Sequence, residues 1–290
     1  MKTVAFVGLG VMGYPMAGHL SGAGYAVRVY NRTGERAEQW CGTYAGERCA
    51  TPREAAAQAD AVFVCVGNDD DVRSVVYGDD GVLAGLRSGC VLVDHTTASA
   101  DLARELHAAA GDADCGFLDA PVSGGQAGAE NGALTVMVGG DEATFRRLRP
   151  VLDSYAKSVR LMGPAGAGQL TKMVNQICIA GILQGLAEGL HFAEQAGLDP
   201  NEVVEVIAKG AAQSWQMDNR SATMARGEFD FGFAVNWMRK DLDITLATAR
   251  KVHARLPLTA LVDQFYADVQ SYGGGRWDTS SLIERLRRRG

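Results

Sequence analysis

Three glycines near the amino terminus have the spacing of a turn that binds a phosphate group. Gly8, Gly10 and Gly13 follow an apolar run over 4–7, which predicts a strand, and lead into a helix predicted over 12–21. In such a strand–turn–helix the first glycine permits a tight turn, the second lets a pyrophosphate approach the backbone, and the third allows close packing. The start of the helix would offer free N–H groups to the phosphates. The residues expected to bind a dinucleotide here are Gly8, Gly10, Val11, Met12 and Gly13.

The end of the second predicted strand, Ala26–Tyr30, indicates which dinucleotide is bound. NAD enzymes usually place an acidic residue there to hold the ribose 2′-hydroxyl. This chain has Asn31, Arg32 and Thr33 instead. Arg32 can pair with a 2′-phosphate through two N–H groups, and Asn31 and Thr33 can add hydrogen bonds. The sequence therefore favours NADP(H); if Arg32 is only a surface arginine, NAD(H) would also serve.

A lysine in an apolar helix is the candidate for acid–base chemistry. Lys172 and Asn175 are three residues apart in a helix predicted over 170–196, so they share one face. Burying a lysine among apolar residues is costly unless the lysine has a partner or a function. Burial would also lower its pKa towards the range of a general acid. The alternative is a lysine whose long side chain reaches solvent from the first helical turn.

The elements around these residues divide the chain into two domains. Short β-rich runs alternate with helical patterns up to Gly163, which predicts an α/β fold, a doubly wound, mainly parallel Rossmann sheet. Beyond Pro164 almost every pattern is helical. We therefore predict a dinucleotide-binding domain over 1–163 and an all-α domain for substrate binding and dimerisation over 164–290. The predicted strands are Val4–Val7, Ala26–Tyr30, Ala61–Val66, Cys90–Asp94, Phe117–Asp119 and Leu134–Val138.

The long predicted helix carries glycines at every fourth position. Gly181, Gly185 and Gly189 lie on one stripe of a helix that is apolar nearly all round, so we expect it to be buried. Each glycine costs about 1 kcal/mol relative to alanine in a helix interior. Close approach of another helix would explain them, and that helix could belong to this chain or to a second subunit. A homodimer or homotetramer is expected.

Composition excludes several classes of partner. The net charge of −6 argues against binding to nucleic acid. The most apolar stretch, 173–190, contains two glutamines, an asparagine and a glutamate, which argues against a membrane span. Six cysteines show no spacing typical of a metal site, and several lie in apolar runs as buried thiols would. We expect no metal and a cytoplasmic location.

Four motifs in order resemble the β-hydroxyacid dehydrogenase family, over the whole chain. That family includes 3-hydroxyisobutyrate dehydrogenase, tartronate semialdehyde reductase and the glyoxylate–succinic semialdehyde reductases. The motifs are Phe6-Val-Gly8-Leu-Gly10-Val-Met-Gly13 with Pro15-Met16-Ala17, Asp119-Ala-Pro-Val-Ser123-Gly124-Gly125, the segment Gly166 to Asn175, and Lys240-Asp241-Leu242.

The resemblance implies a role for each matching position. Lys172 would exchange a proton with the substrate oxygen as hydride is transferred, and Asn175 would orient the substrate. Ser123, Gly124 and Gly125 would bind the substrate carboxylate. The implied cofactor contacts are Val66, Gly67 and Asp71 along the adenosine–phosphate edge, Thr96 near the nicotinamide, and Lys240 from the helical domain.

Two stretches depart from the family pattern. Relatives commonly carry Leu-Pro where this chain has Val66-Gly67, followed by Asn68 and three aspartates over 69–71. Three acids would be unfavourable beside a polyanionic cofactor, so we expect them to begin the next helix, where negative charge is stabilising. His95 stands where a small polar residue is more usual, and we expect it to be structural.

These observations predict an NADP(H)-preferring oxidoreductase that transfers hydride between the nicotinamide and a small aldehyde acid or the corresponding β- or γ-hydroxy acid. One alternative is an NAD-dependent dehydrogenase of 3-hydroxyisobutyrate or a serine-like β-hydroxy acid. Another is a non-catalytic dinucleotide-binding module, which would be expected to lose the lysine at 172.

Overall fold

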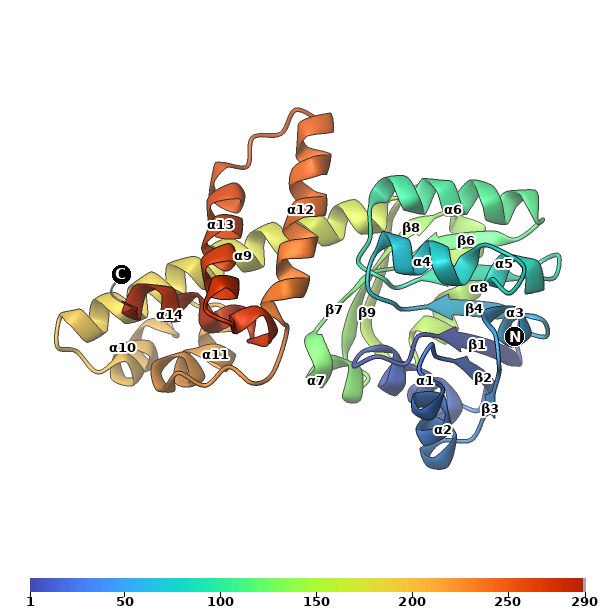
Figure 1. Cartoon of the computed structure of the whole chain (residues 1–290), viewed down its shortest axis with the longest axis horizontal. Helices are drawn as coiled ribbons and strands as arrows, with labels where there is room; N and C mark the ends of the chain where they lie inside the picture. The colour runs from blue at the N-terminus through green and yellow to red at the C-terminus, as the bar shows by residue number, and fades with distance from the viewer. Residues whose placement is uncertain (289–290) are drawn as a thin grey trace. The chain divides into compact units, whose positions relative to one another are not determined.

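The computed structural model describes residues 1–288, and the chain divides into two compact units (Figure 1). The first unit comprises residues 1–172 and the second begins at Met173. The boundary predicted at Gly163-Pro164 lies before helix α9 (Ala167–Gln195), whereas the compact units separate inside this helix. The first turn of α9 belongs to the first unit because it is hydrogen-bonded there, as described below.

A nine-stranded sheet forms the centre of the first unit. Its order is β3-β2-β1-β4-β5-β6-β8-β7, with β9 paired to β8. The first six strands in this order, β3-β2-β1-β4-β5-β6, are parallel. Strand β8 runs antiparallel to β6 and β7, and β9 is parallel to β8. The order of the first six strands in the chain is that of the Rossmann fold, whose ligands bind beyond the carboxyl ends of β1 and β4. The strands are β1 (Thr3–Val7), β2 (Ala26–Tyr30), β3 (Glu47–Arg48), β4 (Ala61–Val64), β5 (Val91–Asp94), β6 (Gly116–Asp119), β7 (Val122–Ser123), β8 (Leu134–Gly140) and β9 (Ala156–Gly163).

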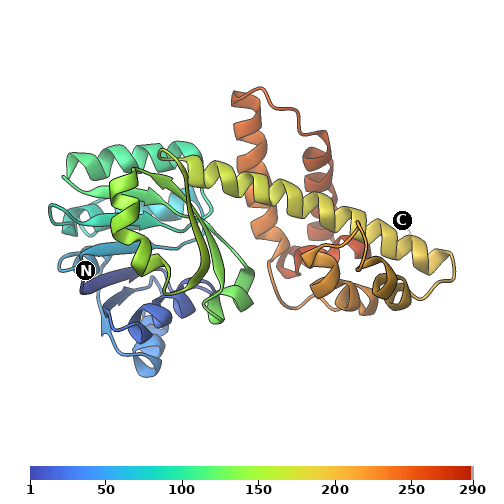
Figure 2. The ribbon, with the colours of Figure 1, turned by 180° about the vertical axis from the view of Figure 1, so that it is seen from behind.

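Helices cover both faces of this sheet, as Figure 1 and the reverse view in Figure 2 show. Alternate residues of β1 point to opposite faces, so Phe6 joins one apolar cluster with Trp40, while Val7 joins the other with Leu102 and Leu106. Strands buried on both faces read as continuous apolar runs, as in 61–64. The helices of this unit are α1 (Gly13–Gly22), α2 (Gly34–Thr43), α3 (Pro52–Ala56), α4 (Asp69–Val76), α5 (Val82–Gly85), α6 (Ala100–Asp112), α7 (Gly125–Glu130) and α8 (Glu142–Leu152).

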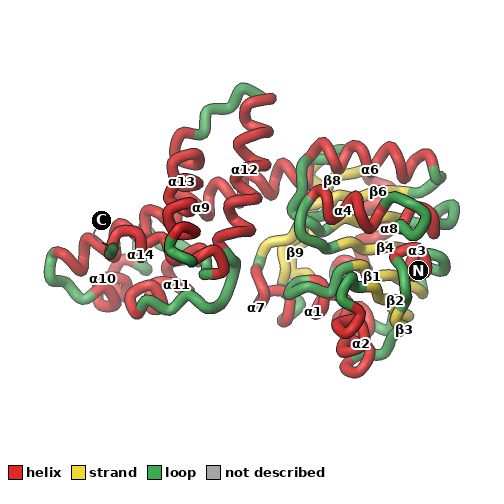
Figure 3. Tube along the Cα trace, in the orientation of Figure 1, coloured by secondary structure: helices red, strands yellow, loops and turns green. Residues whose placement is uncertain are grey.

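In the part of the second unit that the structure describes, helices joined by loops are the regular elements, whereas every named strand lies in the first unit (Figure 3). Its core joins Leu183 and Leu190 of α9 to Leu242 of α12 and Tyr266 of α13. The predicted fold class is thus confirmed. Besides the greater part of α9, the helices are α10 (Pro200–Ile207), α11 (Trp215–Arg226), α12 (Val235–Lys251), α13 (Pro257–Ser271) and α14 (Leu282–Arg287).

Local sequence explains where several helices begin and end. Thr51 accepts a hydrogen bond from the Glu54 N–H group, and Pro52 occupies the first helical position of α3. Asp199 caps α10 in the same way, again with a proline at its first position. After α9, Gly197 adopts a positive φ of 74°, which a glycine tolerates without strain.

The expectation that α9 is buried was wrong for this chain. Val174, Ile182 and Phe192 are 59%, 41% and 71% exposed. A Cβ at Gly181 would touch Leu258, but Cβ atoms at Gly185 and Gly189 would meet no atom within 4 Å. Residues 1–288 therefore supply a close neighbour for the first glycine of the stripe and not for the other two.

Length and composition alone would let α9 cross a membrane, and no other helix within residues 1–288 passes the same test. Core helices of soluble proteins pass it too. In this chain α9 contributes Ala180, Leu183, Ala187 and Leu190 to the buried core of the second unit.

Candidate active site

The glycine turn has the geometry that its spacing predicts. Gly8 has a positive φ of 98°, and a Cβ there would overlap the carbonyl oxygen of Cys65 at the end of β4. A Cβ at Gly13 would overlap the carbonyl oxygen of Gly8, so the first turn of α1 packs directly against the loop. A Cβ at Gly10 would meet no protein atom within 4 Å. The space beside Gly10 is therefore open to the pyrophosphate of a dinucleotide.

The start of α1 suits an anion. Its first turn contains no acidic residue, and Met12 provides no side-chain cap. No side chain therefore occupies the N–H groups at this end, of which that of Tyr14 donates to the Gly10 carbonyl at 3.0 Å, and the helix dipole favours negative charge there. The turn is held from both sides at Leu9, whose N–H group donates to Asn31 Oδ1 at 2.9 Å and whose carbonyl accepts from Arg36 Nε at 2.6 Å. These residues fit a dinucleotide. Arg36 was not singled out by sequence analysis, because nothing in its spacing indicates this contact.

Two neighbouring residues after β2 have different surroundings: the Asn31 side chain holds the loop, whereas the Arg32 side chain faces solvent. Asn31 uses both its side-chain polar atoms internally, since Nδ2 donates to the Thr33 carbonyl at 2.9 Å. The Arg32 side chain is 83% exposed, and its Nη1 lies 3.2 Å from Asp71 Oδ1. The structure thus brings together two residues predicted to contact the cofactor, Arg32 and Asp71.

The three consecutive aspartates begin α4, as predicted. Asn68 caps this helix by accepting a hydrogen bond from the Asp71 N–H group at 2.8 Å. Asp69 accepts from the N–H and hydroxyl groups of Ser99 at 2.9 and 2.5 Å, and so ties α4 to the start of α6. The Asp70 side chain is 97% exposed.

The loops after β4 and β5 are joined through Thr96, which is buried. Its Oγ1 accepts from the Val66 N–H group at 3.0 Å, and its own N–H group donates to Asp94 Oδ1 at 2.9 Å. Gln169 of α9 donates to the Thr96 carbonyl at 2.7 Å and accepts from the Ala98 N–H group at 3.1 Å. The Thr96 hydroxyl therefore supports the loop that contains Val66 and Gly67. Its predicted approach to the nicotinamide stays a prediction.

A buried carboxylate fixes the start of α9. Asp119, at the end of β6, accepts hydrogen bonds from the N–H groups of Gly166 at 2.7 Å and Gln169 at 2.9 Å. Burial raises the pKa of Asp119, and these hydrogen bonds oppose the rise. Side chains at Gly139 or Gly168 would overlap the Asp119 carboxylate or nearby backbone. The start of α9 is thus hydrogen-bonded to Asp119, the first residue of the motif from Asp119 to Gly125 that also contains Ser123.

Lys172 lies three residues beyond Gln169 on the same helix and is only 7% exposed. Its burial agrees with the predicted lysine of an apolar helix rather than with one that reaches solvent. Ser123 belongs to β7 in the same unit and is half-buried, and Gly124 and Gly125 follow it with positive φ angles of 134° and 62°.

Continuing along α9, the second unit gathers further polar groups. Asn175 Nδ2 donates to Gln176 Oε1 at 2.8 Å, and Gln176 Nε2 donates to Asp241 Oδ2 at 2.7 Å. Lys240 Nζ lies 3.0 Å from Asp241 Oδ1. Asn175 and Lys240, both predicted to be functional, are therefore linked through Gln176 and Asp241. Asp241 was quoted only as part of a motif, and its burial (2% exposed) could not be read from that motif.

His95 is structural, as expected. It stacks on Phe63, and burial lowers its pKa to about 4, so the ring is neutral near neutral pH. Its Nδ1 lies 2.6 Å from the Ala120 carbonyl and its Nε2 2.9 Å from the Tyr155 hydroxyl. The neutral ring therefore donates through Nδ1 and accepts through Nε2.

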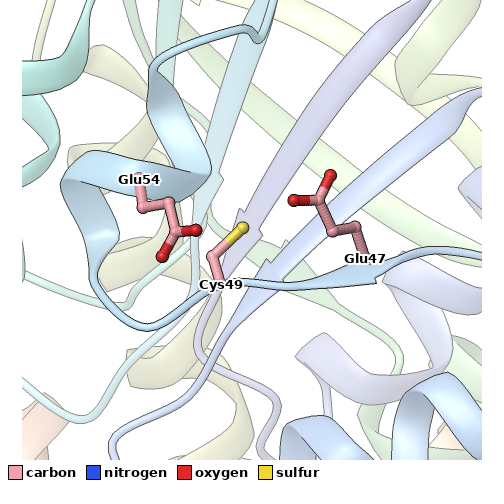
Figure 4. A group of neighbouring side chains, drawn as sticks. All are labelled: Glu47, Cys49 and Glu54. Atoms are coloured by element: carbon pink, nitrogen blue, oxygen red, sulfur yellow. The ribbon is translucent and has the colours of Figure 1, made fainter.

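One cluster has ligand types that bind metals, but its contacts assign it to the fold. The side chains of Glu47, Cys49 and Glu54 converge as Figure 4 shows. Arg28 Nη1 lies 2.5 Å from Glu47 Oε2, and Glu54 Oε2 accepts from the Ala50 N–H group at 2.6 Å. Burial raises the pKa of Cys49 to about 11, so its sulfur stays protonated. The contacts with Arg28 and with the Ala50 N–H group therefore account for both glutamates within the fold.

Two family models together match almost the whole chain. Residues 3–163 match the NAD binding domain of 6-phosphogluconate dehydrogenase, and residues 166–286 match the model described as NAD-binding of NADP-dependent 3-hydroxyisobutyrate dehydrogenase. The chain belongs to the 3-hydroxyisobutyrate dehydrogenase, or β-hydroxyacid dehydrogenase, family. The predicted resemblance is confirmed.

Several known proteins are similar to this chain over nearly the full length of both sequences. An uncharacterised oxidoreductase of Shewanella frigidimarina is 63% identical, covering 99% of this chain and 98% of its own. The 2-hydroxy-3-oxopropionate reductase of Escherichia coli is 34% identical, covering 98% of this chain and 96% of its own. The structure of Mycobacterium tuberculosis 3-hydroxyisobutyrate dehydrogenase with L-serine has a TM-score of 0.90 at 34% identity, covering 99% of this chain and 100% of that one.

The chain is therefore an NAD(P)-dependent dehydrogenase that acts on hydroxy acids. This result excludes the alternative of a non-catalytic dinucleotide-binding module. It agrees with the geometry, which places a glycine turn and a buried lysine in the same unit.

Asp94 makes stability depend on pH. Burial raises its pKa to about 7, although hydrogen bonds from Thr96 oppose the rise. A carboxyl group with a raised pKa favours the folded state at low pH, and this contribution is lost as the pH rises through about 7. Relative to Asp94→Asn, the wild type should lose on the order of 3 kcal/mol of unfolding free energy between pH 5 and pH 9. Urea unfolding followed by circular dichroism would measure it.

Asp141 provides the control. Burial raises the pKa of this carboxyl group, but the hydrogen bonds from Thr144 outweigh burial and leave it below its usual value. Asp141 is therefore ionised throughout this pH range, and the difference between wild type and Asp141→Asn should stay constant. A constant difference for Asp94→Asn as well would contradict the prediction.

Proposed function

We propose that this enzyme is an NADP(H)-preferring reductase of small aldehyde acids, reversible with the corresponding β- or γ-hydroxy acids, and that Lys172 is its general acid–base. The burial of Lys172 carries this proposal. A lysine side chain that is only 7% exposed needs a specific interaction or a function to offset the cost of its burial. The start of its helix is hydrogen-bonded to Asp119, the first residue of the stretch that also contains Ser123.

Each residue would have one task in the reaction. A bound nicotinamide supplies or accepts the hydride. Lys172 would give a proton to the carbonyl oxygen of the substrate in reduction and take it back in oxidation. Asn175, one helical turn further along α9, would orient the substrate, and Ser123 with the two glycines after it would hold the substrate carboxylate.

Three observations support NADP(H) as the preferred cofactor. The matched family model is described by an NADP-dependent enzyme. No acidic residue stands at 31–33, where an NAD enzyme would place one. The exposed guanidinium of Arg32 and the neighbouring Arg36, fixed to the glycine turn, put positive charge at this end of β2.

A second candidate is NAD-dependent oxidation of a serine-like β-hydroxy acid. It is favoured by the likeness to the M. tuberculosis enzyme with L-serine and by the pairing of Arg32 with Asp71. Turnover of purified enzyme with NADPH or NADH, on glyoxylate and on succinic, tartronate and methylmalonate semialdehydes, and with NAD⁺ or NADP⁺ on L-serine, would separate the two candidates.

A homodimer or homotetramer also belongs to this proposal. The exposed apolar residues of α9 and the open space at Gly185 and Gly189 support a contact with a second copy. A cytoplasmic location is proposed as well, because each of the cysteines 41, 49, 65, 90, 115 and 178 is a free thiol.

Replacing the lysine tests the mechanism. Lys172→Ala should lower kcat by about 10²-fold to 10⁴-fold, because it removes the proton donor. Binding of NADPH, followed by its fluorescence, should persist. Lys157→Ala, which removes an exposed lysine of β9, is the matched control and should leave turnover unchanged. Survival of turnover in Lys172→Ala would refute the proposed mechanism.

Replacing Arg32 tests the cofactor preference. Arg32→Ala should lower kcat/KM for NADPH by about tenfold to 100-fold, since a hydrogen bond to a charged group is lost. The value for NADH should barely change. Arg146→Ala serves as the control, because Arg146 is also exposed and paired with an acid, Glu142, on α8. An equal fall for both cofactors, or none for NADPH, would speak against the preference.

A substitution in the glycine stripe of α9 tests the proposed homodimer or homotetramer. Gly185→Leu should shift the mass measured by light scattering towards the monomer, because a leucine would prevent close approach of a second helix. Gly111→Leu is the matched control, since Gly111 is also an exposed glycine of a helix with open space at its Cβ position. An unchanged mass for Gly185→Leu would remove Gly185 from the subunit contact.

A further inference from the structure

The three acids at the start of α4 have different surroundings, although they are consecutive. Asp69 is occupied by two hydrogen bonds from Ser99. Asp70 extends into solvent, with Arg73 at 3.8 Å. Asp71 lies 3.2 Å from a guanidinium nitrogen of Arg32, the residue proposed to bind the 2′-phosphate. Only Asp71 is therefore placed to act on that proposed site.

Asp71 is the more fixed member of this ion pair. Its N–H group donates to the capping side chain of Asn68 at 2.8 Å, and its carbonyl accepts from the Ser74 hydroxyl at 2.8 Å. Its side chain is 29% exposed, against 83% for Arg32. The acid thus belongs to a rigid helix start, while the arginine reaches across to it from the loop after β2.

The same guanidinium cannot serve two anions equally. A carboxylate at hydrogen-bonding distance occupies one of the N–H donors of Arg32 and offsets part of its charge. A 2′-phosphate that bound the arginine would also be repelled by the nearby carboxylate. A ribose 2′-hydroxyl carries no charge, so it would not be repelled.

Asp71 could also help the phosphate, by holding Arg32 in place. That benefit is small, because ion pairs between exposed side chains contribute little. The repulsion acts in any orientation of the arginine within a Debye length of about 10 Å at 0.1 M salt. Competition therefore outweighs positioning.

We propose that Asp71 is a specificity-determining residue, whose carboxylate competes with the 2′-phosphate of NADP(H) for Arg32 and so limits the preference for NADP(H) over NAD(H). This inference rests on the proposed function, in which Arg32 binds that phosphate. It predicts that removing the charge of Asp71 makes the site more selective for the phosphorylated cofactor.

Binding of two nucleotide fragments to the full chain would test the proposal without turnover. Adenosine 2′,5′-bisphosphate carries the 2′-phosphate, and adenosine 5′-monophosphate lacks it. Asp71→Asn keeps an oxygen acceptor for Arg32 but removes the charge. By calorimetry at low salt, it should bind the bisphosphate about threefold to tenfold more tightly than the wild type, and the gain for the monophosphate should be clearly smaller. The gain should shrink at high salt.

Asp70→Asn is the matched control. It removes the same charge from the same helical turn, where the side chain is exposed and Arg32 is not its partner. It should change the affinity for the bisphosphate by much less than Asp71→Asn. Its melting temperature would show any common loss of stability at the start of α4, where negative charge is stabilising.

The outcomes separate the two proposals. Equal effects of the two variants, or weaker binding of the bisphosphate by Asp71→Asn, would overturn the inference while leaving the proposed function in place. If wild type bound both fragments equally and Arg32→Ala changed neither affinity, the preference for NADP(H) would fail, and the inference with it.

Discussion

The hydrogen bonds of one buried carboxylate fix the start of α9 and, with it, the position of Lys172, the proposed general acid–base. Asp119 ends β6 and accepts from the N–H groups of Gly166 and Gln169. Gly139 and Gly168 leave room for this contact, which a side chain at either position would obstruct. Because a helix is rigid over a few residues, fixing its first turn also fixes Lys172, three residues beyond Gln169. The loops that carry Val66 and Thr96 are joined to the same turn through the Gln169 side chain.

At the carboxyl ends of the strands, two buried carboxyl groups lie on the same sheet edge as the positive end of the α1 dipole. Because Asp94 and Asp119 are buried, their pKa values are raised, and hydrogen bonds to each carboxyl group oppose this rise. At the start of α1, by contrast, no acid occupies the first turn. Negative charge is placed one strand away, at the start of α4, where it stabilises that helix and meets Arg32. The same charges thus serve helix capping and set the electrostatic field at the nucleotide-binding edge.

Much of the fold and part of the site could be predicted because they depend on local patterns. The glycine turn, the strand over 26–30 and the capped helix after Thr51 follow from residues close together in the chain. Strand β9 and helices α8 and α11 are among the elements that were not predicted. Exposed residues interrupt the apolar pattern of β9, and α11 has few apolar residues. The burial of α9 was overestimated because an apolar composition does not say which side another element covers.

The sequence by itself determined the family, the division into an α/β part and a helical part, and the glycine turn that suits a dinucleotide. These features depend on the spacing of residues along the chain, which can be read without knowing which residues are in contact. Only the tertiary structure decided the partners: Arg32 meets Asp71 across 39 positions, and Asp119 meets Gln169 across 50. Contacts over such separations depend on how the strands are ordered and how their loops meet at one edge. No local pattern encodes them, because the same side chains would find other partners in a differently ordered sheet.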